Sequence, residues 1–173
     1  MDSVAQLAQQ YFLLKMGVGH HQSSIDWALE RLRLDQEGDD LNVVLLAAAT
    51  TREEATPLIE AILETYMEIS SIDDRFAAGK YVTVLHAAYL AGQETIESLD
   101  EKFTKLYTRL KFPNWLTMLS RNCEYATDIP EFREPFEKEF EYIADLWAAS
   151  TSLADFESKY SHVISNSHDA KYG

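Results

Sequence analysis

Apolar residues recur every three or four positions through most of the chain. The first helix shows the pattern most simply, because Val4, Leu7, Tyr11 and Leu14 fall on one side of it. Equivalent spacings continue to Val163, and no segment convincingly shows the alternation of a half-buried strand. We therefore predict an all-α protein.

Residues that favour helix ends divide this pattern into short helices. Thr51-Arg-Glu-Glu54 matches a capping box, in which side chains satisfy the free amides of a first helical turn. The other expected helix starts are Ser23 or Ser24, Asp40, Ser71, Asn114 and Ser152. Short connections between eight or nine helices favour stacked antiparallel helical hairpins. An irregular bundle is the main prediction, and a short hairpin solenoid stays open.

The length of the chain sets the expected domain organisation. A chain of 173 residues supports its own core, so we predict a single helical domain over residues 1–165. Residues 166–173 form a polar tail that we expect to fray. The helix predicted over 73–91 is apolar on nearly every side, which favours a central position. Gly79 weakens this helix by about 1 kcal/mol relative to alanine, and we expect a close helix crossing there.

The composition disfavours several classes of protein. Six Gly and four Pro are about half of the usual supply, which disfavours a sandwich or barrel of many short strands. The single cysteine, Cys123, allows no internal disulfide and suits a reducing compartment. The first residues do not resemble a signal peptide, and the longest apolar run, 43–49, is far shorter than a membrane span of about 20 residues. These features predict a cytoplasmic protein.

The histidines and the cysteine form no recognisable motif for catalysis or metal binding. No histidine follows Glu or Asp by three or four residues, and neither His-Glu-x-x-His nor Cys-x-x-Cys occurs. We therefore predict no cofactor and no metal. His20 and His21 are expected as a cationic pair near the C-terminal end of the first helix, where the helix dipole favours them. His86 is expected as a core histidine.

The net charge limits the kinds of partner. Fifteen basic and 29 acidic side chains leave a charge of −14, which argues against nucleic acid and anionic membranes. The charge is unevenly spread, at −9 over residues 1–75, +2 over 76–121 and −7 over 122–173. The last block holds the most informative helix.

That helix separates its apolar and acidic residues. At 100° per residue, an acidic stripe of Glu134, Glu137, Glu141 and Asp145 lies opposite an apolar face. That apolar face is formed by Phe136, Phe140, Ile143 and Trp147. Like charges at these spacings destabilise a helix, so local stability does not explain the acidic stripe. Further acids lie upstream, together with tyrosine, which is enriched at interfaces. The predicted partner-binding residues are Glu124, Tyr125, Asp128, Glu131, Glu134, Glu137, Glu141, Tyr142 and Asp145.

The acidic stripe also has two simpler explanations. One is a solvated face that only keeps the protein in solution. The other is internal docking on Lys102, Lys105 and Arg109, which share a face of the helix predicted over 96–111.

Three functions follow from these patterns. The leading hypothesis is a non-enzymatic binding protein, of the immunity or inhibitor type, that neutralises a basic protein partner through electrostatic and aromatic contacts. The alternative is a scaffold or regulatory module that binds a peptide or helix in an apolar groove, suggested by Trp27, Trp115 and Trp147. The second alternative is a small metal-dependent hydrolase that uses His20, His21 or His86. A homodimer formed through an aromatic helix face is also open.

Overall fold

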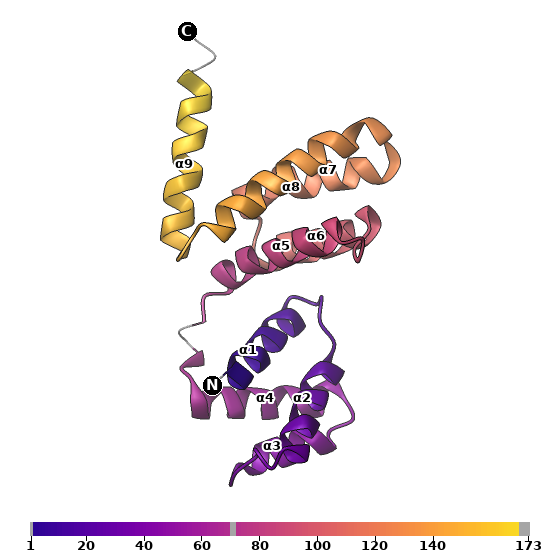
Figure 1. The fold of residues 1–173 in the computed structure, drawn as a ribbon, viewed down its shortest axis with the longest axis vertical. Helices are drawn as coiled ribbons and strands as arrows, with labels where there is room; N and C mark the ends of the chain where they lie inside the picture. The colour runs from indigo at the N-terminus through magenta and orange to yellow at the C-terminus, as the bar shows by residue number, and fades with distance from the viewer. Residues whose placement is uncertain (1, 70–71, 170–173) are drawn as a thin grey trace. The chain divides into compact units, whose positions relative to one another are not determined.

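The computed structural model describes residues 2–69 and 72–169, and the side chains of residues 4–69 and 72–162. All regular structure in these ranges is helical, which confirms the all-α prediction. The elements are α1 (Asp2–Lys15), α2 (His21–Arg33), α3 (Leu41–Ala48), α4 (Arg52–Tyr66), α5 (Asp74–Leu90), α6 (Ile96–Arg109), α7 (Asn114–Asp128), the short 3₁₀ helix η2 (Pro130–Phe132), α8 (Arg133–Ala148) and α9 (Leu153–Asp169) (Figure 1).

Contacts between Cα atoms divide the chain into two compact units. Unit 1 comprises residues 1–73 with helices α1 to α4, and unit 2 comprises residues 74–173 with helices α5 to α9. The single domain over 1–165 stays a prediction.

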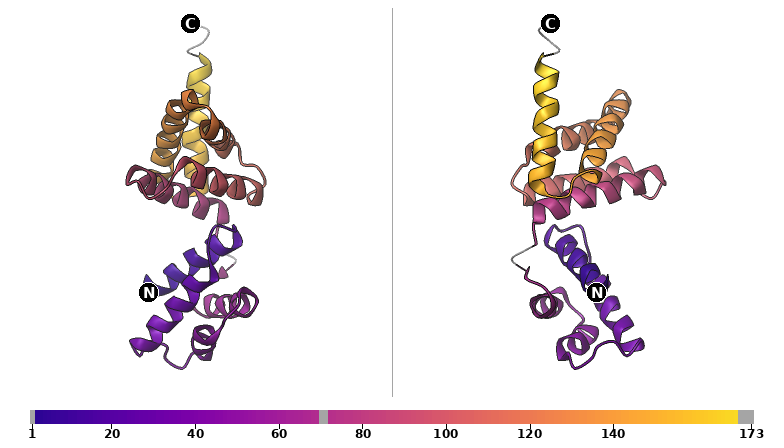
Figure 2. Two further views of the ribbon diagram at one scale, coloured as in Figure 1. Left: turned by 90° about the vertical axis from the view of Figure 1, so that its right-hand side faces the viewer. Right: turned by 60° about the vertical axis from the view of Figure 1, so that its left-hand side comes forward.

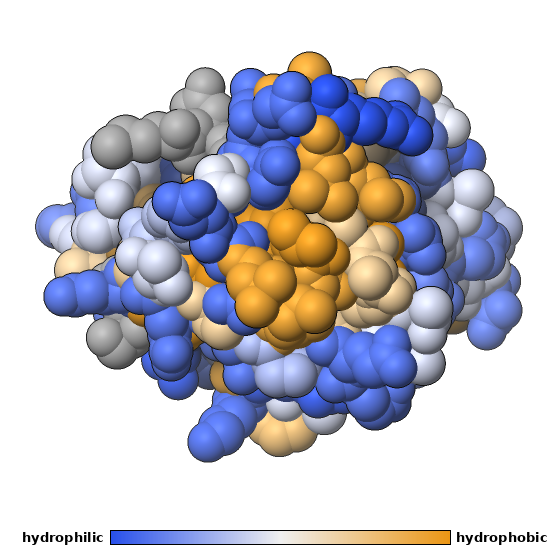
Figure 3. Space-filling view, turned by 90° about the horizontal axis from the view of Figure 1, so that it is seen from below, coloured by the Kyte–Doolittle hydropathy of each residue, from blue (hydrophilic) through white to orange (hydrophobic). Residues whose placement is uncertain are grey.

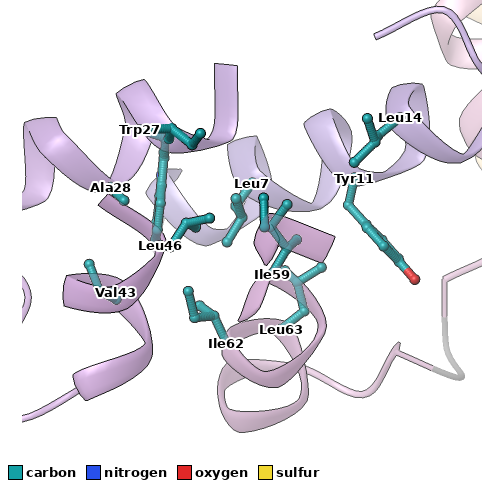
Figure 4. Packing of buried hydrophobic residues seen from close by; sticks show 12 residues of the cluster. Leu7, Tyr11, Leu14, Trp27, Ala28, Val43, Leu46, Ile59, Ile62 and Leu63 are labelled. Carbon is teal, nitrogen blue, oxygen red and sulfur yellow. The ribbon is translucent and has the colours of Figure 1, made fainter. Parts of the chain in front are cut away.

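Unit 1 is built around one apolar core to which all four helices contribute. α2 packs against α3 and α4, while α1 packs against α2 and α4. Leu7, Leu46 and Ile59, which come from three of these helices, point toward one another (Figure 4). The apolar face predicted for α1 lies in this core. The buried members are Leu7, Tyr11, Leu14, Ile25, Trp27, Ala28, Val43, Leu46, Ala55, Ile59, Ile62 and Leu63.

The starts of the helices in unit 1 follow the expected capping rules with one exception. Asp40 caps α3 by accepting the amide of Asn42, and Thr51 caps α4 by accepting the amide of Glu54, as predicted. α2 begins earlier than expected, because His20 and not a serine is its N-cap. The predicted cap at Ser71 lies outside the described residues.

Unit 2 consists of two stacked helix pairs and a last helix beside them. α8 packs on α5, α7 packs on α6 and on α8, and α9 contacts α8 (Figure 2). Aromatic rings fill the space between them: Trp147 stacks on Phe156 at 3.7 Å between ring centroids and meets Trp115 edge-on at 5.1 Å. The largest fully buried aromatic side chains of this unit are Phe103, Phe136, Phe140, Trp147 and Phe156.

Gly79 marks the crossing of α5 and α8, as predicted. A Cβ atom at this position would lie closer than 3.0 Å to three ring atoms of Trp147, a separation that real Cβ atoms essentially never show. One residue along, the Lys80 ammonium donates hydrogen bonds to the carbonyl oxygens of Trp147 and Ser150, each at 2.6 Å. Only glycine lets the backbone of α5 approach the indole ring this closely.

Three predictions about helices of unit 2 need correction. α5 is not buried all round, because Val84 and Leu90 are exposed. α7 has Pro113 as its N-cap, with no side-chain hydrogen bond, and Asn114 is already its first helical residue. α9 continues through Asp169, into the segment predicted as a tail, and residues 170–173 lie outside the described residues.

Candidate partner-binding surface

The acidic stripe lies on the outer face of α8. Glu134, Glu141 and Asp145 are exposed and Glu137 is half-buried, whereas the opposite, apolar face of the helix is buried. The acidic residues of α8 therefore lie on one face of the helix and its buried apolar residues on the opposite face, as the helical periodicity predicted.

Two bases on the same helix neutralise half of the acidic stripe. Lys138 Nζ pairs with Glu134 Oε1 at 2.6 Å, and Arg133 Nε donates to Glu137 Oε1 at 3.1 Å. The hydrogen bond from Lys138 lowers the pKa of Glu134. Pairs of opposite charge four residues apart stabilise a helix, so the net repulsion within the acidic stripe is smaller than the acids alone imply.

Glu137 also joins α8 to α5. The Tyr89 hydroxyl donates to Glu137 Oε1 at 2.7 Å, and this hydrogen bond is the main cause that lowers the pKa of the Glu137 carboxyl. Beside this contact lies a groove of about 380 Å³ between the two helices, with Phe140 and His86 in its lining. The ring of His86 meets Phe140 edge-on at 4.8 Å, which gives the histidine a packing role.

The basic residues of α6 do not dock the acidic stripe. Lys102 bonds to Glu94, just before α6, and Lys105 pairs with Glu101 within α6 at 2.8 Å. Among the ion pairs of the described residues, Arg109 has none. The structure therefore gives no support to internal docking.

A second group of acids has no such neutralisation. Asp100 of α6 lies close to Glu124 and Asp128 of α7, and we name these three residues the acidic cluster. Burial is the main cause that raises the pKa of Asp100, and the charges of Glu124 and Asp128 raise it further. Asp100 Oδ1 is buried and has no hydrogen-bond partner among the described residues. The three carboxylates therefore repel one another.

The surroundings of the acidic cluster form a shallow groove between α6 and α7. This groove of about 330 Å³ has Asp100, Glu124 and Tyr125 in its lining. Arg121 also lines it, but within the described part of the chain it forms no ion pair with the acidic cluster. The groove thus presents carboxylates beside an exposed aromatic ring.

The remaining predicted site residues differ in their surroundings. Tyr125 is exposed and packs edge-on against Phe132 at 4.9 Å, which holds its ring at the end of α7. Glu131 is exposed in η2. Tyr142 is half-buried, and its pKa is raised by burial and by the nearby Tyr160 and Glu139. Tyr142 therefore lies beside Tyr160 of α9 and is not part of the acidic cluster.

Sequence reasoning missed one member of the acidic cluster. Asp100 lies in the nearly neutral middle block, where the local charge balance draws no attention. In the sequence, the only mark of Asp100 is that it directly follows Leu99, an apolar residue that the structure shows to be buried. The pairing of α6 with α7 brings it beside Glu124.

His20 and His21 belong to unit 1, and His86 lines the α5–α8 groove of unit 2. His20 Nδ1 accepts the backbone amide of Gln22 at 3.0 Å, and the ring of His21 stacks on that of His20 at 4.3 Å. The pair therefore begins α2 and does not end α1, which corrects the sequence prediction. No three His, Cys, Asp or Glu side chains in the described ranges are placed to hold a metal ion.

The three tryptophans belong to the cores. Trp27, Trp115 and Trp147 are all buried, which counts against the scaffold hypothesis. Small parts of Trp27 and Trp115 still line surface grooves of about 480 Å³ in unit 1 and about 470 Å³ in unit 2. Within the described residues, none of the helices combines the length and apolar character needed to cross a bilayer.

Comparisons with known proteins add no relationship. No family model, curated protein or solved structure matches the chain significantly.

Proposed function

We propose that this protein is a non-enzymatic binding protein that captures a basic protein partner on unit 2. The acidic cluster supplies the charge, and Tyr125 supplies an aromatic contact beside it. A protein of the immunity or inhibitor type acts in this way, by covering a basic surface of its partner. The cytoplasmic location stays a prediction from the single cysteine.

One observation carries the proposal. Asp100 Oδ1 is buried without a hydrogen-bond partner among the described residues, in a groove that Glu124 also lines. The charges of Glu124 and Asp128 raise the pKa of Asp100, and none of the ion pairs in the described residues relieves this repulsion. A Lys or Arg side chain from a partner, placed between Asp100 and Glu124, would exchange repulsion for attraction. Groups held in an unfavourable electrostatic environment are a common feature of functional sites.

The acidic stripe contributes in a secondary way. Glu141 and Asp145 are exposed and form no ion pair with other described residues. Exposed charges of this kind speed the encounter with an oppositely charged partner more than they add to affinity, and salt weakens the effect. We therefore expect the acidic cluster to determine affinity and the acidic stripe to affect association rate.

The experiment compares capture by three forms of the full chain. Immobilised wild-type protein is exposed to native lysate at low salt, beside Glu124→Gln/Asp128→Gln and the control Glu64→Gln/Glu157→Gln. Both variants remove two negative charges, and the control residues are exposed acids far from the acidic cluster in sequence. The captured protein is then purified and its affinity for each form is measured as a function of salt.

The proposal expects a captured protein with net positive charge. Its affinity should fall at least tenfold for the acidic-cluster variant, which corresponds to about 1.4 kcal/mol, and little for the control. Binding to the wild type should also weaken more steeply with salt than binding to the acidic-cluster variant. Equal loss in both variants, or an acidic captured protein, would show that the acidic cluster is not the binding surface.

A further inference from the structure

Helix α3 is apolar on both of its sides. Val43 and Leu46 face the core of unit 1 and are buried. On the outer side, Leu41, Val44 and Leu45 keep 66%, 41% and 45% of their surface exposed, and Ala48 is exposed as well. The outer four residues follow the spacing i, i+3, i+4, i+7, so they form one continuous strip, which we name the α3 apolar face.

An outer face of this composition is unusual for a surface helix. Such helices normally turn polar residues outward, as the neighbouring α4 does with Glu53 and Glu64. Single exposed apolar residues are common, whereas a contiguous patch with a polar border marks an interaction site. Figure 3 views the molecule from the side where α3 lies and shows an apolar patch surrounded by hydrophilic residues.

The sequence on both sides of α3 is acidic. Residues 34–51 contain four acids and no base, and Glu53 and Glu54 follow in the first turn of α4. The nearest flanking bases are engaged elsewhere: Arg33 pairs with Glu30, and Arg52 donates to the backbone carbonyl of Leu14. A partner that covers this face therefore contacts leucine and valine side chains, with acidic residues before and after them in the chain.

We propose that the α3 apolar face docks an amphipathic helix of another protein, with leucine-like residues on one side and Lys or Arg flanking them. Apolar contact is the main source of affinity in this mode, and the flanking charges orient the bound helix. A second copy of this chain is a poor occupant. Unit 1 has 13 acidic and 4 basic side chains, so two copies would bring surfaces of charge −9 together.

This surface is independent of the acidic cluster. The acidic cluster belongs to α6 and α7 of unit 2, whereas the α3 apolar face belongs to unit 1. Variants of one surface leave the residues of the other intact, so each proposal fails or succeeds separately.

The probe is a fluorescently labelled synthetic peptide of about 14 residues, made of leucine and lysine in a helical repeat. Its binding to the full chain is followed by fluorescence anisotropy. The test variant is Val44→Gln/Leu45→Gln. The matched control, Val84→Gln/Leu90→Gln, removes two exposed apolar side chains from α5. A peptide of the same composition in alternating order shows how much binding comes from charge alone.

The proposal expects the helical peptide to bind the wild type at least tenfold more tightly than it binds the α3 variant. The α5 control and Glu124→Gln/Asp128→Gln should bind like the wild type, and the alternating peptide should bind weakly to all forms. If the double variant does not fold by circular dichroism, Leu41→Gln replaces it, because this side chain is the most exposed of the three.

Three results would overturn the proposal. One is equal affinity of the wild type and the α3 variant for the helical peptide. Another is loss of binding only in the acidic-cluster variant, because the peptide would then report on unit 2. The third is a wild-type dimer in sedimentation that the α3 substitutions dissociate, which would assign the face to a second copy of the chain.

Discussion

Replacing Gly79 with alanine tests how closely α5 and α8 cross. In an ordinary helix this substitution stabilises by about 1 kcal/mol, because alanine has the higher helix propensity. Here the new methyl group meets the indole ring of Trp147. That ring is fully buried, with Phe156 stacked on it and Trp115 at its edge, so it has no room to withdraw.

The magnitude follows from these two opposing effects. Overpacking a filled core typically destabilises by about 1–3 kcal/mol, and the enclosed position of Trp147 favours the upper end of that range. Subtracting the gain in propensity of about 1 kcal/mol leaves a net loss of about 2 kcal/mol. For a chain of this size, the melting temperature should fall by about 4–8 °C.

Urea unfolding, followed by tryptophan fluorescence, measures this loss. A Trp27→Phe background confines the signal to Trp115 and Trp147, both in unit 2. The exposed Ala87→Gly on the same helix is the control, with an expected loss of about 1 kcal/mol from propensity alone. In a Trp147→Phe background the loss caused by Gly79→Ala should shrink, because the smaller ring leaves space. A rise in stability with Gly79→Ala would refute the close crossing.

Three further predictions concern single side chains. Asp100→Asn should raise the free energy of unfolding at pH 7. The raised pKa of Asp100 means that the folded state holds the proton more tightly than the unfolded state, so stability is lost as pH rises through that pKa. Urea titrations across pH should show this loss in the wild type and in the control Glu157→Gln, but not in Asp100→Asn. Burial, with the nearby charges of Asp100 and Glu97, raises the pKa of Cys123 to about 12. A thiol reagent at pH 8 should therefore label the protein only after denaturation, and fast labelling of the native state would contradict this placement. His20→Ala should destabilise unit 1 by about 1 kcal/mol, because the amide of Gln22 loses its acceptor, whereas His20→Asn should retain most of the stability. Urea unfolding followed by Trp27 fluorescence, in a background without the other two tryptophans, measures both effects. Equal losses in the two variants would argue against a capping role for His20.

Local signals in the sequence were enough to predict most helices. The starts of α3 and α4 were predicted because Asp40 and Thr51 satisfy amides only two or three residues away. The start of α2 was wrong because histidine is an uncommon N-cap, and serine is the usual choice. The faces of α8 were also predictable, since a helical period separates Phe140 from Glu141 without any knowledge of neighbouring helices.

The composition of the candidate surfaces depended on contacts between distant residues. The partial neutralisation of the acidic stripe is visible in the sequence, because Arg133 and Lys138 each stand four residues from one of its acids. The acidic cluster was not visible, because Asp100 and Glu124 come together only when α6 packs on α7. Sequence separation carries no information about which helices become neighbours.

The sequence by itself determined where the chain is helical and which residues are apolar, because both depend on interactions within a few residues. Only the tertiary structure decided which apolar residues are covered. In α3, Val43 and Val44 are equally apolar, yet one is buried and the other exposed. The physical reason is that a helix has two sides and its neighbours, α2 and α4, cover only one of them.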